Sequence, residues 1–370
     1  MLISLANIHD RTGNKDEAAR YFEQALAVNT NSLHATLGLY HTKIAQHKPK
    51  EAAPLLARLK ELDLPEPEYL REEANLMLSK GNIEQACKLL YESMRVDPNE
   101  TPETLFTLFS ARLAGLRKTS DPKLVKDAKQ EMTRLASRLQ KNPVARTYHA
   151  PIAFGILNIL EQRYLEARDN FRFAQRSTPD SPSLLERILL LDYGLVDTMS
   201  ANETAHALLR LNPDHPFANY VLGSLAAQEE RWIAAREYLQ KACKFWEAAQ
   251  PYGNLAFVEL QLNDLKNAEF LIRKAINLNR TLFELHDTLG LILMKKKDYT
   301  QAVDAFQRAL RLRQEDPVVS LHLALLYLEM DADRYKENIL ALLPVIDAGA
   351  ASFSGTDLSA YRNLSKTLRK

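Results

Sequence analysis

The chain has 370 residues, and 46% of them are hydrophobic, so it can bury a large core and is not a disordered protein. Its net charge of +1 argues against wholesale electrostatic binding to nucleic acid or to a membrane surface. Its two cysteines, Cys87 and Cys243, are too few for a disulfide framework or a thiolate zinc site.

A pattern of small and apolar residues recurs about every 34 residues from the start of the chain. Its clearest copy runs from residue 283 to 316, where Ala302, Phe306 and Ala309 follow Gly290 at offsets of 12, 16 and 19. Apolar residues at helical spacing flank a polar break in this copy, which predicts two helices and a tight turn. The residues equivalent to Gly290 are Ala6, Tyr40, Ala74, Gly155, Leu189, Gly223, Ala256 and Ala324. With only 11 glycines and no alternating runs of Val, Ile and Thr, the chain is expected to be all-α.

The fourth copy is enlarged, because 81 residues separate Ala74 from Gly155 instead of two periods of 34. We expect an irregular unit at about residues 100–143, with helices near Thr101–Leu116 and Pro122–Gln140. A basic patch coincides with it. The patch consists of Arg112, Arg117, Lys118, Lys123, Lys126, Lys129, Arg134 and Arg138. It suits either a docking surface for an acidic partner or a solvated helix face, and the second interpretation is favoured because charge runs are usually solvated.

The sixth copy carries Asp192 and Gly194 where an apolar first helix would continue. Its second helix is expected to be short, at about Ala201–Leu211. This copy is therefore predicted to bend or loosen the array.

The two ends of the array differ. Ala6 leaves no room for the residues that normally precede it, so the chain is expected to be cut from a longer protein or capped by something else. The repeating array is predicted to span residues 1–347. A link rich in Ser, Gly and Ala then leads to Thr356–Asp357, a predicted N-cap. A C-terminal capping helix is expected at residues 356–370, with Leu358, Tyr361, Leu364 and Leu368 on one side.

These features resemble the tetratricopeptide repeat (TPR) family, which has a 34-residue period, a small residue in the first helix and an Ala–Phe–Ala series in the second. The family also places Pro at the repeat end, and this chain has Pro98, Pro143, Pro179 and Pro213. The resemblance implies a right-handed superhelix of about ten helix-turn-helix repeats. It also implies that the first helices line a concave binding groove.

The register of the repeats predicts which side chains face that groove. The candidate groove residues are Ile152, Ile156, Phe217, Tyr220, Asn254, Phe257, Asp287, Leu291, His322 and Leu325. Apolar and aromatic members suit a peptide or helix laid in a groove, and Tyr220 and Phe257 are the preferred anchors. For each residue taken singly, packing between repeats is an equally good interpretation.

Motifs for catalysis, cofactors and metals are absent from the sequence, so an enzyme is not expected, and neither is a bound cofactor or metal. His41 and His47 are poorly spaced to share a metal. TPR co-chaperones hold an acidic C-terminal tail with Lys, Asn and Arg side chains on three successive first helices. At the equivalent positions of this chain, only Asn254 is compatible with that role. Asn254 also stands nearly alone, so the Asn ladder of TPR glycosyltransferase scaffolds is missing.

The sequence therefore predicts a non-catalytic scaffold that binds protein segments or peptides, with no nucleic-acid partner and an undetermined oligomeric state. Two alternatives stay open. One is a TPR region of a larger bacterial secretion or exopolysaccharide-export protein, and the other is a regulatory domain of a multidomain enzyme. A cytoplasmic location is expected, or a periplasmic one if the chain is part of an exported protein. The longest apolar run, Ala150–Leu160, is too short to span a bilayer, which needs about 20 residues.

Overall fold

The computed structural model describes residues 1–97 and 100–368, and within these ranges it contains helices, turns and links but no strand. The predicted all-α architecture is confirmed. The chain divides into two compact units, Met1–Pro213 (unit 1) and Asp214–Lys370 (unit 2). Pro98, one of the predicted repeat-end prolines, lies outside the described residues.

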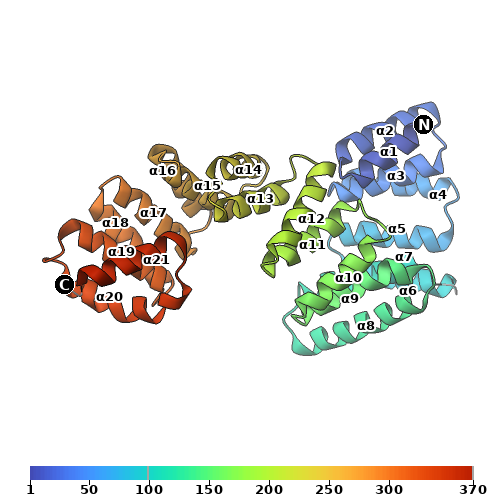
Figure 1. Ribbon diagram of the computed structural model, residues 1–370. Coiled ribbons are helices and arrows are strands. Elements are labelled where there is room, and N and C mark those ends of the chain that lie inside the picture. Colours follow the sequence, from blue (N-terminus) through green and yellow to red (C-terminus); the bar gives the residue numbers. More distant parts are fainter. Residues whose placement is uncertain (98–99, 369–370) are drawn as a thin grey trace. The chain divides into compact units, whose positions relative to one another are not determined.

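Unit 1 is a series of helix pairs in which each helix packs on the next (Figure 1). Its helices are α1 (Leu2–Arg11), α2 (Lys15–Val28), α3 (Leu33–Ala45), α4 (Pro49–Glu61), α5 (Glu66–Ser79), α6 (Ile83–Val96), α7 (Pro102–Leu116), α8 (Pro122–Lys141), α9 (His149–Leu160), α10 (Tyr164–Gln175), α11 (Pro182–Gly194) and α12 (Thr198–Leu211), with a short 3₁₀ helix, η1 (Ala145–Thr147), before α9.

Unit 2 continues the same alternation of first and second helices and adds one helix at its end. Its helices are α13 (Pro216–Gln228), α14 (Trp232–Phe245), α15 (Ala249–Gln261), α16 (Leu265–Leu278), α17 (Phe283–Lys295), α18 (Tyr299–Leu312), α19 (Pro317–Asp331), α20 (Lys336–Ala348) and α21 (Gly355–Leu368), with the 3₁₀ helix η2 (Ala350–Ser352) before α21.

The contact between Gly290 and Phe306 shows why each pair needs a small residue in its first helix. A Cβ atom placed on Gly290 would lie 2.5 Å from the ring of Phe306 on the partner helix. Gly155 stands in the same relation to Phe171, at 2.6 Å. Both phenylalanine rings are fully buried. The two helices of each pair therefore cross at this glycine, and the crossing depends on close approach of the backbones.

The turn inside most pairs places one residue in the left-handed region of the backbone. These residues are Gly13, His47, Gly81, Gln162, Val196, Glu230, Asn263 and Lys297. The N–H of the following residue then closes the first helix, as Asp298 does by donating to the carbonyl oxygen of Leu293 at 2.9 Å. Asp298 also caps α18, since its carboxylate accepts the N–H of Gln301. One turn geometry thus ends the first helix and begins the second.

The fourth pair has nearly the predicted helix bounds, since α7 covers Pro102–Leu116 and α8 covers Pro122–Lys141. Thr101 caps α7 by accepting the N–H of Thr104. The extra length lies in α8, which has 20 residues, and in the link with η1 that follows it.

The prediction of a short second helix in the sixth pair was wrong. Helix α12 has 14 residues, and Asp197 caps it by accepting the N–H of Ser200 at 3.1 Å. Asp192 does not loosen the pair, because its buried carboxylate accepts hydrogen bonds from Arg172 at 3.0 Å and Thr204 at 3.1 Å. A buried acid with these partners is compatible with close packing.

The predicted N-cap of the C-terminal helix was also wrong, because α21 begins at Gly355 and contains Thr356 and Asp357. The N–H groups of Asp357 and Leu358 donate to the carbonyl oxygen of Ser354, at 3.1 and 3.3 Å. Helix α21 packs on α19, and its Leu364 is buried. The side chain of Leu368 lies outside the described residues.

Candidate functional site

Eight of the ten candidate groove residues lie on the first helices of unit 2, namely α13, α15, α17 and α19. These helices contact one another in succession, α13 with α15, α15 with α17, and α17 with α19. They therefore form a continuous row, which we call the first-helix row. The other two candidates, Ile152 and Ile156, lie on α9 in unit 1, where both are buried in the core.

Three aromatic rings gather at the α13 end of the first-helix row. The centroids of Phe217 and Tyr220 are 6.3 Å apart, and the ring of Trp246 meets both edge-on, at 6.0 and 5.4 Å. Phe217 and Tyr220 are half-buried. Trp246 follows α14 and was missed by the sequence analysis, because it precedes a first helix and lies outside the repeat register.

The middle of the row, on α15, presents Asn254 and Phe257, both half-buried. The Asn254 amide donates to Ser224 Oγ on α13 at 2.9 Å, so it joins two neighbouring first helices. Phe257 packs edge-on against Trp232, with ring centroids 6.1 Å apart. Leu291 and Leu325, farther along the row, are half-buried and pack against the core of unit 2.

The two polar candidates at the far end of the row are engaged with each other. His322 Nδ1 lies 2.8 Å from Asp287 Oδ1, and His322 Nε2 lies 3.4 Å from Asp357 Oδ1 on α21. Only 8% of His322 is exposed. The imidazole therefore connects α17, α19 and α21.

The charge of His322 follows from this geometry. Burial by itself lowers the pKa of His322, but the attraction of the Asp287 and Asp357 carboxylates outweighs it and raises the pKa to about 10. The ring is therefore a cation at neutral pH, held between two acids. Since Asp287 and His322 satisfy each other, their geometry indicates a structural tie more directly than a ligand contact.

Half of the basic patch has acceptors within unit 1. Arg112 pairs with Glu131 at 2.6 Å and donates to the hydroxyl of Tyr91 at 2.9 Å. The Lys118 ammonium donates to the carbonyl oxygen of Gly81 at 2.9 Å. The remaining two cations of this half have contacts of the same kind, Lys129 with the carbonyl oxygen of Leu160 and Arg138 with Glu100.

The other half of the patch, Arg117, Lys123, Lys126 and Arg134, is exposed, and these side chains have no hydrogen-bond or ion-pair partner among the described residues. They lie on α8 and on the turn before it. Exposed, unpaired cations on a helix surface are compatible with solvation and need no ligand.

Buried carboxylates form a group that sequence analysis did not identify as special. Glu72 is bonded by His41 at 2.9 Å and by Arg71 at 3.0 Å. Burial opposes ionisation of Glu72, but the bond from His41 outweighs it, so that the pKa of Glu72 falls to about 2. Arg236 similarly bonds the buried Glu259. For Glu259 the available signal was its position between the apolar residues Val258 and Leu260. Glu72 lies between Arg71 and Glu73 and had no such signal.

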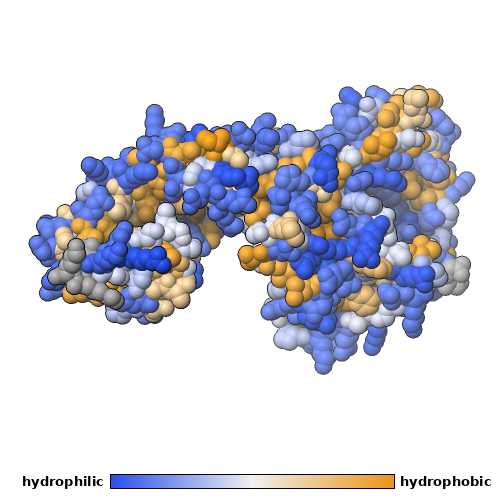
Figure 2. Space-filling model, in the orientation of Figure 1, coloured by the Kyte–Doolittle hydropathy of each residue, from blue (hydrophilic) through white to orange (hydrophobic). Residues whose placement is uncertain are grey.

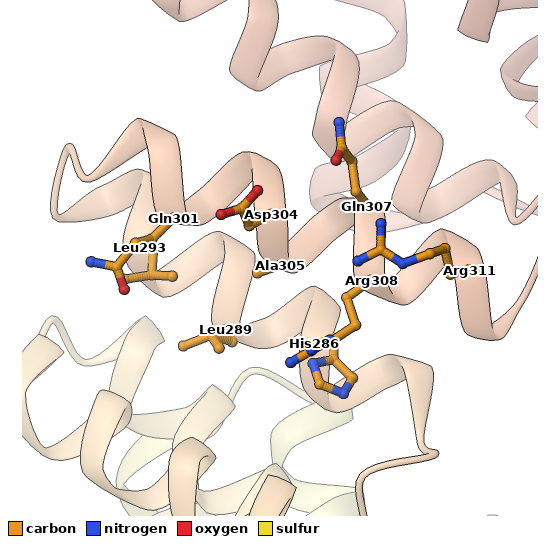
Figure 3. A pocket seen from close by; sticks show the side chains of 9 residues that line it. All are labelled: His286, Leu289, Leu293, Gln301, Asp304, Ala305, Gln307, Arg308 and Arg311. Carbon is orange, nitrogen blue, oxygen red and sulfur yellow. The ribbon is translucent and has the colours of Figure 1, made fainter.

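A pocket of about 400 Å³ lies between α17 and α18 in unit 2 (Figure 3). It is lined by His286, Leu289, Leu293, Gln301, Asp304, Ala305, Gln307, Arg308 and Arg311. A second pocket of about 390 Å³ adjoins it, because the two share His286 and Arg308, and Arg280 lines the second. Neither pocket contains a candidate groove residue.

Unit 1 has a larger pocket of about 890 Å³, formed by the turn after α1 and the link between α10 and α11. Its charged side chains are of both signs, and two of them, Lys15 and Asp10, pair with each other at 2.8 Å. On the face shown in Figure 2, hydrophobic patches are likewise mixed with hydrophilic side chains. The pocket in unit 1 thus shows no convergent set of groups for one class of ligand.

The described residues offer neither a cluster of metal ligands nor a membrane span. No group of three or more His, Cys, Asp or Glu side chains in the described ranges could hold a metal ion. None of the helices described is long and apolar enough to cross a bilayer. Burial raises the pKa of both cysteine thiols, that of Cys243 to about 12, so neither is an activated nucleophile.

Comparison with known proteins gives four matches to models of the tetratricopeptide repeat, at residues 2–36, 190–254, 249–282 and 283–316. The chain is also similar to Cellulose synthase operon protein C of Pseudomonas fluorescens (strain SBW25), with 29% identity over 148 residues. That match covers 34% of this chain and only 11% of the relative.

Among solved structures, the chain is similar to that of the APC/C hetero-tetramer Cut9–Hcn1, with a TM-score of 0.50 and 15% identity. This match covers 98% of the present chain and 95% of the other. The chain is also similar to pilF of Pseudomonas aeruginosa, with a TM-score of 0.46, 16% identity and coverage of 59% and 96% of the two chains. At 15% identity, the likeness to Cut9–Hcn1 shows a shared fold and nothing about function.

Proposed function

The chain belongs to the tetratricopeptide repeat family, and from this premise we propose that it is a non-catalytic scaffold that binds segments of partner proteins along the first-helix row of unit 2. The observation that carries this proposal is the set of half-buried aromatic side chains on adjacent first helices, Phe217 and Tyr220 on α13 and Phe257 on α15. Rigid aromatic side chains supply much of the binding energy at protein interfaces. Because the row is already formed, a bound segment has mainly its own ordering to offset.

The polar groups of the row set the kind of segment it suits. Asn254 presents an amide between the aromatic anchors, while Asp287 and His322 satisfy each other at the far end. An extended or helical segment with apolar side chains fits this arrangement better than one that needs a cationic clamp. In the same proposal, α21 caps the array. It packs on α19, and stacked repeats require a terminal cap.

The test compares Tyr220→Ala/Phe257→Ala with Phe270→Ala. Phe270 is a matched control because it lies on the second helix α16 and is 67% exposed, outside the first-helix row. Partners captured by the wild-type chain from a cell extract would be identified, purified and titrated against each variant. We expect the double variant to lose at least about tenfold in affinity and Phe270→Ala to keep it. Equal affinity of a correctly folded double variant would refute the assignment of the row.

A second proposal is that the chain is the TPR region of a larger exopolysaccharide-export protein. The similarity to Cellulose synthase operon protein C, which matches over a small part of its length, favours it. The two proposals differ in location, since a scaffold of the first kind is expected in the cytoplasm and an export component in the periplasm. Fractionation of cells that carry a tagged chromosomal copy distinguishes them. Loss of exopolysaccharide on deletion would support the second proposal, and a cytoplasmic product with unchanged exopolysaccharide would exclude it.

A further inference from the structure

The pocket between α17 and α18 gathers positive charge that the chain does not neutralise. Arg308 and Arg311 line this pocket, and Arg280 lines the pocket that adjoins it. Within the described part of the chain, none of these three guanidinium groups has a hydrogen-bond or ion-pair partner. This distinguishes them from Arg236, whose guanidinium group donates a hydrogen bond to the buried Glu259.

Two elements bring the three arginines together. Arg308 and Arg311 are three residues apart on α18, so their side chains are neighbours on one face of the helix. Arg280 lies in the link between α16 and α17, where its carbonyl oxygen accepts a hydrogen bond from His286 Nε2 at 3.1 Å. Figure 3 shows His286, Arg308 and Arg311 at the same end of the pocket.

The acidic residue of the pocket does not neutralise this end. Asp304 precedes Arg308 by one helical turn, a spacing at which acid and base commonly pair. No such pair forms, and Figure 3 shows Asp304 and Gln301 away from His286, toward the other end. The three arginines and the one carboxylate, Asp304, give the two joined pockets a net charge of +2.

The pKa of His286 responds to the positive charge of these arginines. This residue is only 2% exposed and contributes its Nε2–H to the Arg280 carbonyl. Burial lowers the pKa of His286, the hydrogen bond to the Arg280 carbonyl opposes this, and the nearby charges of Arg308 and Arg311 lower the pKa further. An anion bound near Arg308 and Arg311 would cancel the effect of their charges.

We infer that these joined pockets bind a phosphate-type dianion through Arg280, Arg308 and Arg311. The planar guanidinium group matches a phosphoryl group in bidentate geometry, and two negative charges balance the net charge of the site. The volume of about 400 Å³ accommodates a phosphoryl group together with part of the molecule that carries it. The amides of Gln301 and Gln307 provide further donors. None of the candidate groove residues lines this site, although part of it is formed by α17, and anion binding here would be independent of segment binding through those residues.

The experiment titrates the purified chain with inorganic phosphate and with pyrophosphate by calorimetry, and follows the ring C–H signals of His286 by NMR across pH. Binding is expected to raise the pKa of His286 by about half a unit or more, because the anion offsets the field of the arginines. Phosphate that binds without moving this pKa would place the anion elsewhere and overturn the inference.

Three variants locate the site. Arg308→Gln/Arg311→Gln is expected to weaken pyrophosphate binding by at least about tenfold, since two charge-assisted contacts are lost. Arg362→Gln, which removes one exposed charge on α21, serves as the control and should leave affinity unchanged. Asp304→Asn is expected to tighten binding severalfold by removing the one repelling carboxylate, a gain that a folding defect cannot mimic.

A further titration, with a short polyglutamate peptide, distinguishes a site for phosphate groups from one for carboxylates. The inference requires that phosphate or pyrophosphate bind more tightly than this peptide. Equal or tighter binding of polyglutamate would overturn it in favour of a surface for carboxylates. Unchanged pyrophosphate affinity in the double arginine variant would also overturn it.

Discussion

His322 Nδ1 lies 2.8 Å from Asp287 Oδ1, which ties two successive first helices together at residues 35 positions apart. Asp357 stands another 35 positions on and reaches the other ring nitrogen. Helix α21 thus presents an acid to α19 at the same spacing at which α19 presents its histidine to α17. The tie extends the register of the repeats into the C-terminal helix.

Stability of unit 2 should therefore depend on pH through His322. Its pKa is about 10 when folded and about 6.5 when unfolded, so its contribution is complete below pH 6.5 and is lost as pH rises through 10. His322→Gln is expected to lower the free energy of unfolding by about 3 kcal/mol at neutral pH, because two acids lose their cation. The difference from wild type should shrink between pH 6.5 and pH 10 and be small above pH 10.

Urea unfolding followed by tryptophan fluorescence measures this effect, because the two tryptophans of the chain, Trp232 and Trp246, both lie in unit 2. His206→Gln, at an exposed position on α12, is the control and should change stability by less than about 0.5 kcal/mol. A wild-type to His322→Gln difference that stays constant from pH 6 to above 10 would contradict the tie.

Gly290 should tolerate no side chain. Gly290→Ala is expected to destabilise unit 2 by roughly 1–3 kcal/mol, and Gly290→Leu by more, because the added atoms meet the ring of Phe306. The control is Gly194→Ala at the end of α11, where a Cβ has no neighbour within 4 Å. That variant should be neutral or stabilising by up to about 1 kcal/mol. Denaturation midpoints measure both, and an unchanged midpoint for Gly290→Leu would refute the assigned crossing.

Val196 should be a position where glycine improves the fold. It has a φ of 59° although it is β-branched, and 77% of it is exposed, so its side chain contributes little packing to offset the strain. Val196→Gly is expected to stabilise unit 1 by about 1 kcal/mol. Leu195→Gly, at the neighbouring residue with a φ of −86°, should instead destabilise it. Circular dichroism during denaturation compares the two, and a destabilised Val196→Gly would show that this turn is not strained.

The cysteines should react slowly in the folded chain. With a pKa of about 12, Cys243 carries a thiolate fraction at pH 8 that is about a thousandfold below that of an ordinary cysteine. In a Cys87→Ser variant, a disulfide reagent should therefore label Cys243 at least about a hundredfold more slowly in buffer than in urea. Equal rates in the two solvents would mean that the thiol is not buried as the structure shows.

Several features of the fold could be predicted because they are local. The 34-residue period, the bounds of α7 and α8, and the crossing of Gly290 with Phe306 all follow from helical spacing and from the size of single residues. The errors had a different origin. Asp192 and Gly194 looked disruptive in sequence, yet Asp192 is bonded by Arg172 and Thr204, which come from two other helices.

The sequence by itself determined that this chain is an all-α series of helix pairs, since periodicity and side-chain size act within one pair. Only the tertiary structure decided which side chains meet across pairs. The stacking of successive helices joined Asp287, His322 and Asp357, brought Trp246 to Phe217 and Tyr220, and placed Arg280 beside the pocket of Arg308 and Arg311. These groups are tens of residues apart, and their charges and burial depend on neighbours that no spacing within one repeat reveals.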